Sequence, residues 1–165
     1  MAKWSGWKSI DEPSGCHTAA VYKIRLTVDG RSVQISRFLA NDEGGTLSIG
    51  HASKMERRRR QFVAAMNVGR GHSEMNLLWR LQKQSMLKHR FPAARYEYCF
   101  QNVTSVDKAK AVERQLIKSY VLHFGEVPPL NSAIPGRYVG ETWDSAVGDS
   151  RREWSTTPGS GASGA

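Results

Sequence analysis

The chain has 165 residues, 39% of them hydrophobic, and a formal net charge of +9. This length suits one domain with short terminal segments. No apolar run approaches the roughly 20 residues of a membrane-spanning helix, the first residues lack the apolar stretch of a signal peptide, and Cys16 and Cys99 have no metal-binding spacing. We therefore expect a cytoplasmic protein without disulfide bonds.

The positive charge is concentrated in one part of the chain. Residues 51–100 carry 11 basic and 3 acidic side chains, whereas the remaining segments are close to neutral. A clustered positive field attracts phosphate backbones, so the distribution favours a nucleic-acid partner. The alternative is a basic surface that keeps the protein in solution and has no partner.

The first third of the chain predicts an irregular arm followed by strands. Residues 1–16 are rich in Trp, Ser, Gly and Pro, which is typical of an irregular segment. The pair Asp29-Gly30 is a hairpin turn signal between two runs of β-branched and aromatic residues. Strands are predicted over residues 17–28, 32–39 and 46–50.

The following segments predict helices and one more strand. Ser53 and Glu56 have the spacing of a capping box, so a helix is expected over residues 54–66. Ser105 and Gly125 are the expected caps of the longest helix, residues 106–124. A second helix is predicted over residues 73–88 and a half-buried strand over residues 95–100.

The order of these elements predicts an α+β fold. We expect a small, mostly antiparallel sheet of three to four strands, flanked by helices. The predicted organisation is an N-terminal arm at residues 1–16, a domain at residues 17–148, and a flexible C-terminal tail at residues 149–165, which has few apolar anchors.

Two charged residues are predicted to lie on apolar helix faces. Glu113 shares a face with Ala109, Leu116, Ile117 and Tyr120, at steps of three and four residues. A carboxylate there costs several kcal/mol unless it is paired or binds a cation, so it is either a structural partner of an arginine or a metal ligand.

Arg58 is the matching cation, because the residues three before and four after it, Met55 and Phe62, are apolar. Its neighbours Arg57, Arg59 and Arg60 cannot all face the core with it, so we expect them to be solvated or to contact phosphate. His51 lies between a predicted strand and a predicted helix, a position suited to phosphate binding or proton transfer. A structural role is the alternative for His51.

These residues occur in the order of the GIY-YIG nuclease family, which the chain resembles over about residues 18–135. Ala20-Val21-Tyr22 resembles the first signature tripeptide, and Ser48-Ile49-Gly50 resembles the second. Arg58 follows Gly50 by eight residues, as the family's helical arginine does. Glu113 is similar to the family's metal-binding glutamate, and Leu130-Asn131 is similar to a pair that often follows it.

The resemblance implies a Mg²⁺-dependent DNA endonuclease, with Mn²⁺ as a substitute for Mg²⁺. Its catalytic set would be Tyr22, Ser48, His51, Arg58 and Glu113, with Glu113 holding the metal. Double-stranded DNA would be the partner, contacted by Arg57, Arg59, Arg60, Arg70 and Asn131.

A long separation between the two tripeptides and an added helical segment resemble the restriction-enzyme and phage-endonuclease branches. That branch implies action in the cytoplasm of a bacterial or phage-infected cell. A cut through both strands with one active site per chain implies a homodimer or a higher homo-oligomer.

Two departures from the family pattern leave activity open. Ser48 replaces the second signature tyrosine, and Phe62 stands where the family usually has His or Tyr. His51 is a candidate substitute for a lysine that sometimes follows the second tripeptide. The alternatives are a catalytically inactive nucleic-acid-binding module and a protein-interaction domain with a basic surface.

Overall fold

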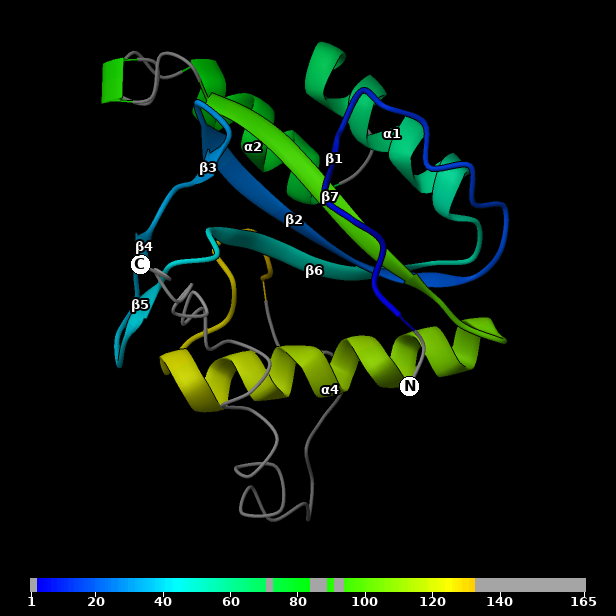
Figure 1. Ribbon diagram of the computed structural model, residues 1–165. Coiled ribbons are helices and arrows are strands. Elements are labelled where there is room, and N and C mark those ends of the chain that lie inside the picture. The colour runs from blue at the N-terminus through cyan, green and yellow to red at the C-terminus, as the bar shows by residue number, and fades with distance from the viewer. Residues whose placement is uncertain (1–2, 71–72, 84–88, 91–93, 133–165) are drawn as a thin grey trace, which may run out of the picture.

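The computed structural model describes residues 3–70, 73–83, 89–90 and 94–132 and has an α+β fold (Figure 1). A five-stranded sheet carries most of the strands, and a short two-stranded ribbon lies beside it. The sheet consists of β1 (Lys8–Ser9), β2 (Ala20–Val28), β3 (Arg31–Ser32), β6 (Thr46–Ala52) and β7 (Ala94–Asn102). The ribbon pairs β4 (Ile35–Ser36) with β5 (Asn41–Asp42), and the helices are α1 (Met55–Val68), α2 (Ser73–Lys83) and α4 (Val106–Phe124).

Strand β2 is the centre of the sheet. It pairs antiparallel with β7 over its whole length, from Ala20 opposite Asn102 to Val28 opposite Ala94. On its other side it pairs antiparallel with β6 and, beyond a bulge, with β3. Both neighbours hide β2 from solvent at its edges, which explains why its residues are buried or nearly so. The predicted, mostly antiparallel sheet is confirmed.

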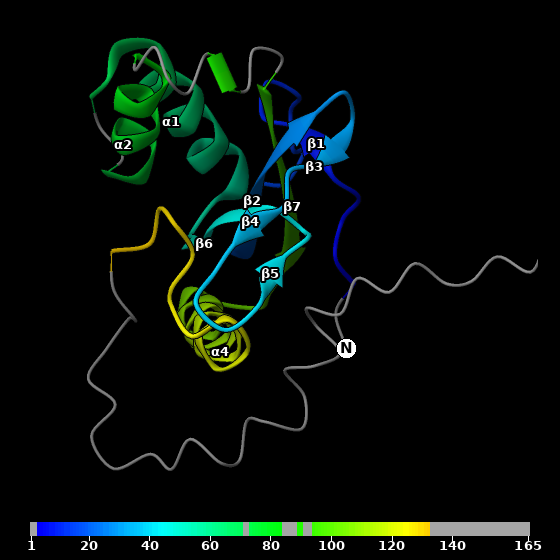
Figure 2. The same ribbon diagram turned by 90° about the vertical axis from the view of Figure 1, so that its left-hand side faces the viewer.

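The two faces of β2 enter different cores. Tyr22 and Ile24 point to the side of α1 and α2, where they join Met55, Phe62 and other buried apolar residues. Val21 points to the opposite side, where it packs against the apolar face of α4. Figure 2 shows α1 and α2 on one side of the sheet and α4 on the other. The sheet therefore separates α1 and α2 from α4.

Helix α4 has the predicted boundaries, and both predicted caps are confirmed. The hydroxyl of Ser105 accepts a hydrogen bond from the backbone N–H of Lys108, with 3.1 Å between the oxygen and the nitrogen. Gly125 ends the helix with a left-handed φ of 82°, a conformation that costs glycine little. Of the predicted second helix, Ser73–Lys83 is confirmed, and residues 84–88 lie outside the described residues.

The N-terminal arm differs from its prediction as an irregular segment. Lys8–Ser9 forms β1 and extends the sheet beyond β7, with Lys8 opposite Tyr98. Ile10 is buried in the core. The sequence pattern gave no sign of this strand because two residues carry no detectable period, and the pairing partner is almost 90 residues away. The predicted strand over residues 32–39 is also wrong, since it is divided between β3 and β4.

The predicted capping box of α1 is wrong. The N-cap residue is Lys54 and makes no side-chain capping hydrogen bond. Instead, the backbone N–H groups of Met55 and Glu56 donate to the carbonyls of Thr18 and Cys16, in the segment before β2. The first turn of α1 is thus capped by a distant part of the chain rather than by Ser53.

Glu56 ties the N-terminal arm to α1. Its carboxylate accepts hydrogen bonds of 2.8 Å from the backbone N–H and from the hydroxyl of Ser14. The Arg59 guanidinium contacts the same carboxylate at 2.8 Å and donates to the backbone carbonyls of Ile10 and Asp11. Arg59 and the Ser14 donors hold the pKa of Glu56 well below its usual range, although burial opposes the shift.

In the described part of the chain, no helix combines the length and the apolar character needed to cross a membrane. The predicted tail at residues 149–165 and the end of the predicted domain, residues 133–148, lie outside the described residues.

We expect Glu56→Gln to lower the free energy of unfolding by about 3 kcal/mol at neutral pH, because it leaves buried Arg59 without its counter-ion. The stabilisation from a depressed carboxylate pKa is complete above the pKa of the unfolded chain, about 4.3, and is lost as the pH falls below it. The difference from wild type should therefore shrink between pH 5 and pH 3, as urea denaturation can show. Glu12→Gln, at an exposed carboxylate, is the control, and a difference that stays constant with pH would contradict the assignment.

Candidate active site

The candidate site is built around residues 50–53, at the end of β6 and the start of its connection to α1. Strand β6 ends at Ala52 and α1 begins at Met55, so Gly50, His51, Ala52 and Ser53 form the end of an edge strand and the start of a helix junction. Side chains from β2, α4 and α1 reach this short stretch from different directions.

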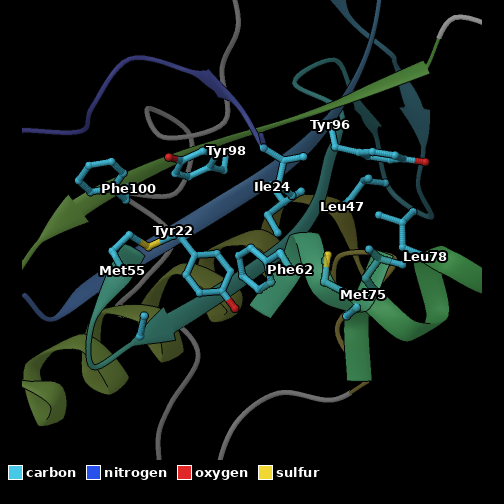
Figure 3. Close-up of a cluster of buried hydrophobic side chains, with 14 of the residues drawn as sticks. Tyr22, Ile24, Leu47, Met55, Phe62, Met75, Leu78, Tyr96, Tyr98 and Phe100 are labelled. Atoms are coloured by element: carbon cyan, nitrogen blue, oxygen red, sulfur yellow. The ribbon is translucent and has the colours of Figure 1, made fainter. Parts of the chain in front are cut away.

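Tyr22 reaches the junction from β2. It is paired with Gly50, and a Cβ atom placed on Gly50 would lie only 2.2 Å from the Tyr22 hydroxyl oxygen. The hydroxyl therefore lies directly over the glycine backbone. The tyrosine ring is 2% exposed and packs edge-on against Phe62, with 5.1 Å between ring centroids (Figure 3). Only glycine at position 50 leaves room for this ring.

Glu113 reaches the junction from α4. One of its carboxylate oxygens lies 2.6 Å from Nδ1 of His51, whose partner across the sheet, Val21, points toward α4. The Glu113 side chain is 12% exposed and that of His51 is 30% exposed. With Nδ1 donating to the carboxylate, Nε2 of His51 is left as the acceptor nitrogen. Among the described residues, the second carboxylate oxygen of Glu113 accepts no hydrogen bond.

Arg58 reaches the junction from the second turn of α1. With Arg57 and Lys54 it lines a pocket of about 230 Å³ that also contains Ala52 and Ser53. Gln61 completes the lining, and no acidic side chain belongs to it. Three cations next to the N-terminal turn of a helix create a positive field, which suits a phosphate group.

The structure thus brings Tyr22, Arg58 and Glu113 around one stretch of chain. The hydroxyl of Tyr22 lies over Gly50, Glu113 bonds to His51, and Arg58 shares a pocket with Ala52 and Ser53. Four consecutive residues in extended conformation span roughly 10 Å. The phenol and the cations reach this stretch from the α1 side of the sheet, and the carboxylate and the imidazole reach it from the α4 side.

Three sequence-predicted site residues lie elsewhere. Ser48 is fully buried, opposite Ile24. Arg59 is 9% exposed and is occupied by Glu56 and the arm. The amide of Asn131 bonds to both the N–H and the carbonyl of Ile49, at 3.0 and 2.8 Å, and so acts as a partner for the free edge of β6. We leave these three out of the site.

The other predicted DNA-contacting arginines, Arg57, Arg60 and Arg70, are exposed. Arg60 has a side chain that is 72% exposed, although it also contacts Glu56. The sequence analysis did not single out Lys54 and Gln61, which line the pocket with Arg58. Their spacing of four and three residues from Arg58 would have identified them once the helix and its phase were fixed.

The donor set of the junction fits a magnesium ion that keeps most of its water. Within residues 3–70, 73–83, 89–90 and 94–132, no group of three or more His, Cys, Asp or Glu side chains comes together. Mg²⁺ is commonly held by one or two carboxylates while its remaining ligands are water or substrate oxygens. Glu113, with one carboxylate oxygen directed away from His51, can supply such a single protein ligand.

Comparison of the chain with known family models, with curated proteins and with solved structures found no match.

Gly50→Ala should destabilise the protein by about 1–3 kcal/mol, because the new methyl group cannot coexist with the Tyr22 ring in its present place. Urea denaturation measures the effect. Gly6→Ala is the matched control, since a Cβ atom at Gly6 would meet nothing within 4 Å. In a Tyr22→Leu background, which removes the far end of the ring, the cost of Gly50→Ala should fall. An equal cost in both backgrounds would show that the Tyr22 hydroxyl does not lie over Gly50.

Proposed function

We propose that the protein is a Mg²⁺-dependent DNA endonuclease of the GIY-YIG type. The observation that carries this proposal is that Tyr22, Arg58 and Glu113 converge on residues 50–53. These three residues come from different elements and are far apart in the sequence. Each of the three corresponds to a position that the resemblance to that family marks as functional. Packing alone does not require a cationic pocket and a carboxylate on either side of one strand end.

The basic pocket would hold the phosphate that is cleaved. Arg58 is a permanently charged, planar donor that can form two parallel hydrogen bonds to phosphate oxygens. Lys54 and Arg57 add charge without an acidic residue in the lining to cancel it. As charge develops on the phosphoryl oxygens during attack by water, these fixed cations stabilise it without having to reorganise.

Glu113 would be the metal ligand and His51 its positioning partner. A bound Mg²⁺ would supply Lewis-acid stabilisation of the leaving 3′ oxygen. The hydrogen bond from Nδ1 of His51 fixes the orientation of the Glu113 carboxylate and directs its second oxygen away from the imidazole. The two side chains thus form a unit whose geometry is set before any ligand arrives.

Tyr22 would orient the attacking water through its hydroxyl at Gly50. Its position depends on the packing of the ring against Phe62, which holds the phenol in one direction.

The burial of Tyr22 favours the second candidate function, an inactive nucleic-acid-binding module. Only 2% of this residue is exposed, and Phe62 covers the ring. Under this alternative the basic surface still binds nucleic acid, and the pair of His51 and Glu113 links β6 to α4 without chemistry. Both candidates have double-stranded DNA as the partner and a cytoplasmic location. The endonuclease would in addition act as a homodimer or a higher homo-oligomer to cut both strands.

Cleavage of supercoiled plasmid by the full chain tests the endonuclease. We expect nicking or linearisation with Mg²⁺ and none with EDTA. Glu113→Gln and Arg58→Ala should each lower the rate at least about 100-fold, because each removes a charge that acts in the transition state. DNA binding, measured by gel shift, should change little in Glu113→Gln.

Two matched variants separate these effects from a general loss of charge. Arg60→Ala removes an exposed arginine of the same helix that does not line the pocket, and Glu12→Gln removes an exposed carboxylate of the arm. Both should cleave nearly as wild type does. Absence of cleavage with Mg²⁺ and with Mn²⁺ on several DNAs, together with intact binding, would establish the inactive module instead.

DNA affinity should fall steeply with salt, because each phosphate contact releases counterions. Arg57→Ala should weaken binding for all sequences and reduce the slope of log affinity against log salt by about 1. Fluorescence anisotropy with a labelled duplex at several salt concentrations measures the slope. A slope near zero would exclude phosphate contacts and would favour the third class of function, a protein-interaction domain.

A further inference from the structure

A second pocket lies on the α4 side of the sheet, between the N-terminal arm and the turn that follows β5. Its volume is about 290 Å³, close to the lower end of the range for small-molecule sites. Aromatic, cationic, acidic and hydroxyl groups all contribute to it. The lining consists of Trp4, Ser5, Trp7, Lys23, Arg25, Ser32, Asp42, Gly44, Thr46 and Cys99.

The arm brings two tryptophans to this pocket. The ring of Trp4 lies 4.7 Å from the ammonium of Lys23, and the ring of Trp7 lies 4.1 Å from the guanidinium of Arg25. Trp4 packs against the apolar core under α4, whereas Trp7 remains 37% exposed. An exposed indole in a pocket with cations offers a stacking surface for a planar ligand.

Asp42 gives the pocket a buried acceptor. The residue is 2% exposed, and its Oδ2 atom accepts hydrogen bonds of 2.9 Å from the Thr46 N–H and from the Tyr120 hydroxyl. In the described part of the chain no donor contacts Oδ1. A Cβ atom placed on Gly44 would lie 3.2 Å from Oδ1, so the glycine leaves this oxygen open. Oδ1 therefore faces the pocket, where a ligand N–H group can donate a charge-assisted hydrogen bond to it.

We propose that this pocket binds the base of a nucleotide unit. The base would stack on Trp7 and donate an N–H to Oδ1 of Asp42, while its phosphate would lie near Lys23. Arg25 is bound to Glu97 at 2.6 Å and would support the Trp7 ring from its other face. The volume admits one base and leaves the sugar and phosphate at the opening.

Other ligands fit the lining less well. An organic cation would meet Lys23 and Arg25, which already contact the tryptophan rings. An acidic peptide would bring its carboxylates toward Asp42. A nucleotide alone combines a flat ring, an N–H donor and an anionic group.

The pocket is separate from the candidate active site. Arg25 lies four residues from Val21 along β2, and Val21 is paired with His51, so the two sites are roughly 13 Å apart along the strand. Binding at the pocket requires neither cleavage nor metal. Failure of the endonuclease proposal would therefore leave this one standing, and the reverse also holds.

Isothermal titration calorimetry of the full chain without divalent cations tests the pocket. The probes are AMP, GMP, CMP and UMP, with ribose 5-phosphate as the control that lacks a base. A single-stranded oligonucleotide and a duplex of the same length show whether the base comes from a free nucleotide or from an unpaired strand. We expect saturable binding of base-containing probes and none of ribose 5-phosphate.

Two variants assign the binding to the pocket. Trp7→Ala removes the exposed stacking surface, and Gly44→Ala places a methyl group beside Oδ1 of Asp42. Each should weaken binding at least about tenfold. Gly6→Ala is the same chemical change as Gly44→Ala but in open space, so it should bind as wild type does. Unfolding curves verify that each variant is folded.

Absence of binding in wild type, equal binding of ribose 5-phosphate, or unchanged binding in folded Trp7→Ala and Gly44→Ala would each overturn the proposal.

Discussion

The packing of the Tyr22 ring over Gly50 is the contact on which the architecture of the candidate site depends. Because Gly50 has no side chain, a ring from the central strand can extend across the edge strand and leave its hydroxyl at the surface of the backbone. The same ring fills the space below α1 and meets Phe62 edge-on. The position of α1, and with it the basic pocket at its first turns, therefore follows from one residue that has no Cβ atom. A larger residue at position 50 would separate β2, β6 and α1 at the point where the candidate groups meet.

The pair of His51 and Glu113 differs from the ion pair of Arg59 and Glu56 in how fully its carboxylate is hydrogen-bonded. Glu56 is surrounded by donors from Ser14 and Arg59, so its carboxylate is satisfied within the protein. Among the described residues, the Glu113 carboxylate has one hydrogen-bond partner, His51, and the side chain is 12% exposed. A carboxylate that is largely enclosed and accepts a hydrogen bond on only one oxygen is costly as a structural element, and a single imidazole N–H offsets less of that cost than a guanidinium does. This difference is why we propose a functional role for Glu113 and a structural one for Glu56, although both lie on helices beside the sheet.

How well the sequence predicted each element depended on how local its determinants are. Helix α4 was predicted to the residue because its caps, Ser105 and Gly125, act within one turn of the helix. Strands β2 and β7 were predicted because long alternating or apolar runs carry their own signal. By contrast, β1 consists of two residues whose pairing is decided by β7, and the first turn of α1 is capped by Cys16 and Thr18 rather than by Ser53. The role of Asn131 was also hidden, because a side-chain amide that pairs with a strand edge looks in sequence like any exposed asparagine.

The run of four arginines shows why the pattern of apolar residues along a helix face could not predict which arginines bind a ligand and which are structural. Arg58 and Arg59 are adjacent, and apolar neighbours at three and four residues favoured Arg58 as the enclosed one. The position of Glu56 instead determines which arginine is buried. Its carboxylate lies one turn before Arg59 and is held by Ser14 of the arm. An arginine can be buried only where a partner offsets its desolvation, so Arg59 turns inward and Arg58 remains partly exposed in the pocket with Lys54 and Arg57. The arm therefore influences the candidate site indirectly. By fixing Glu56 it determines that Arg59 is the structural arginine, and it leaves Arg58 in the pocket that we propose binds phosphate.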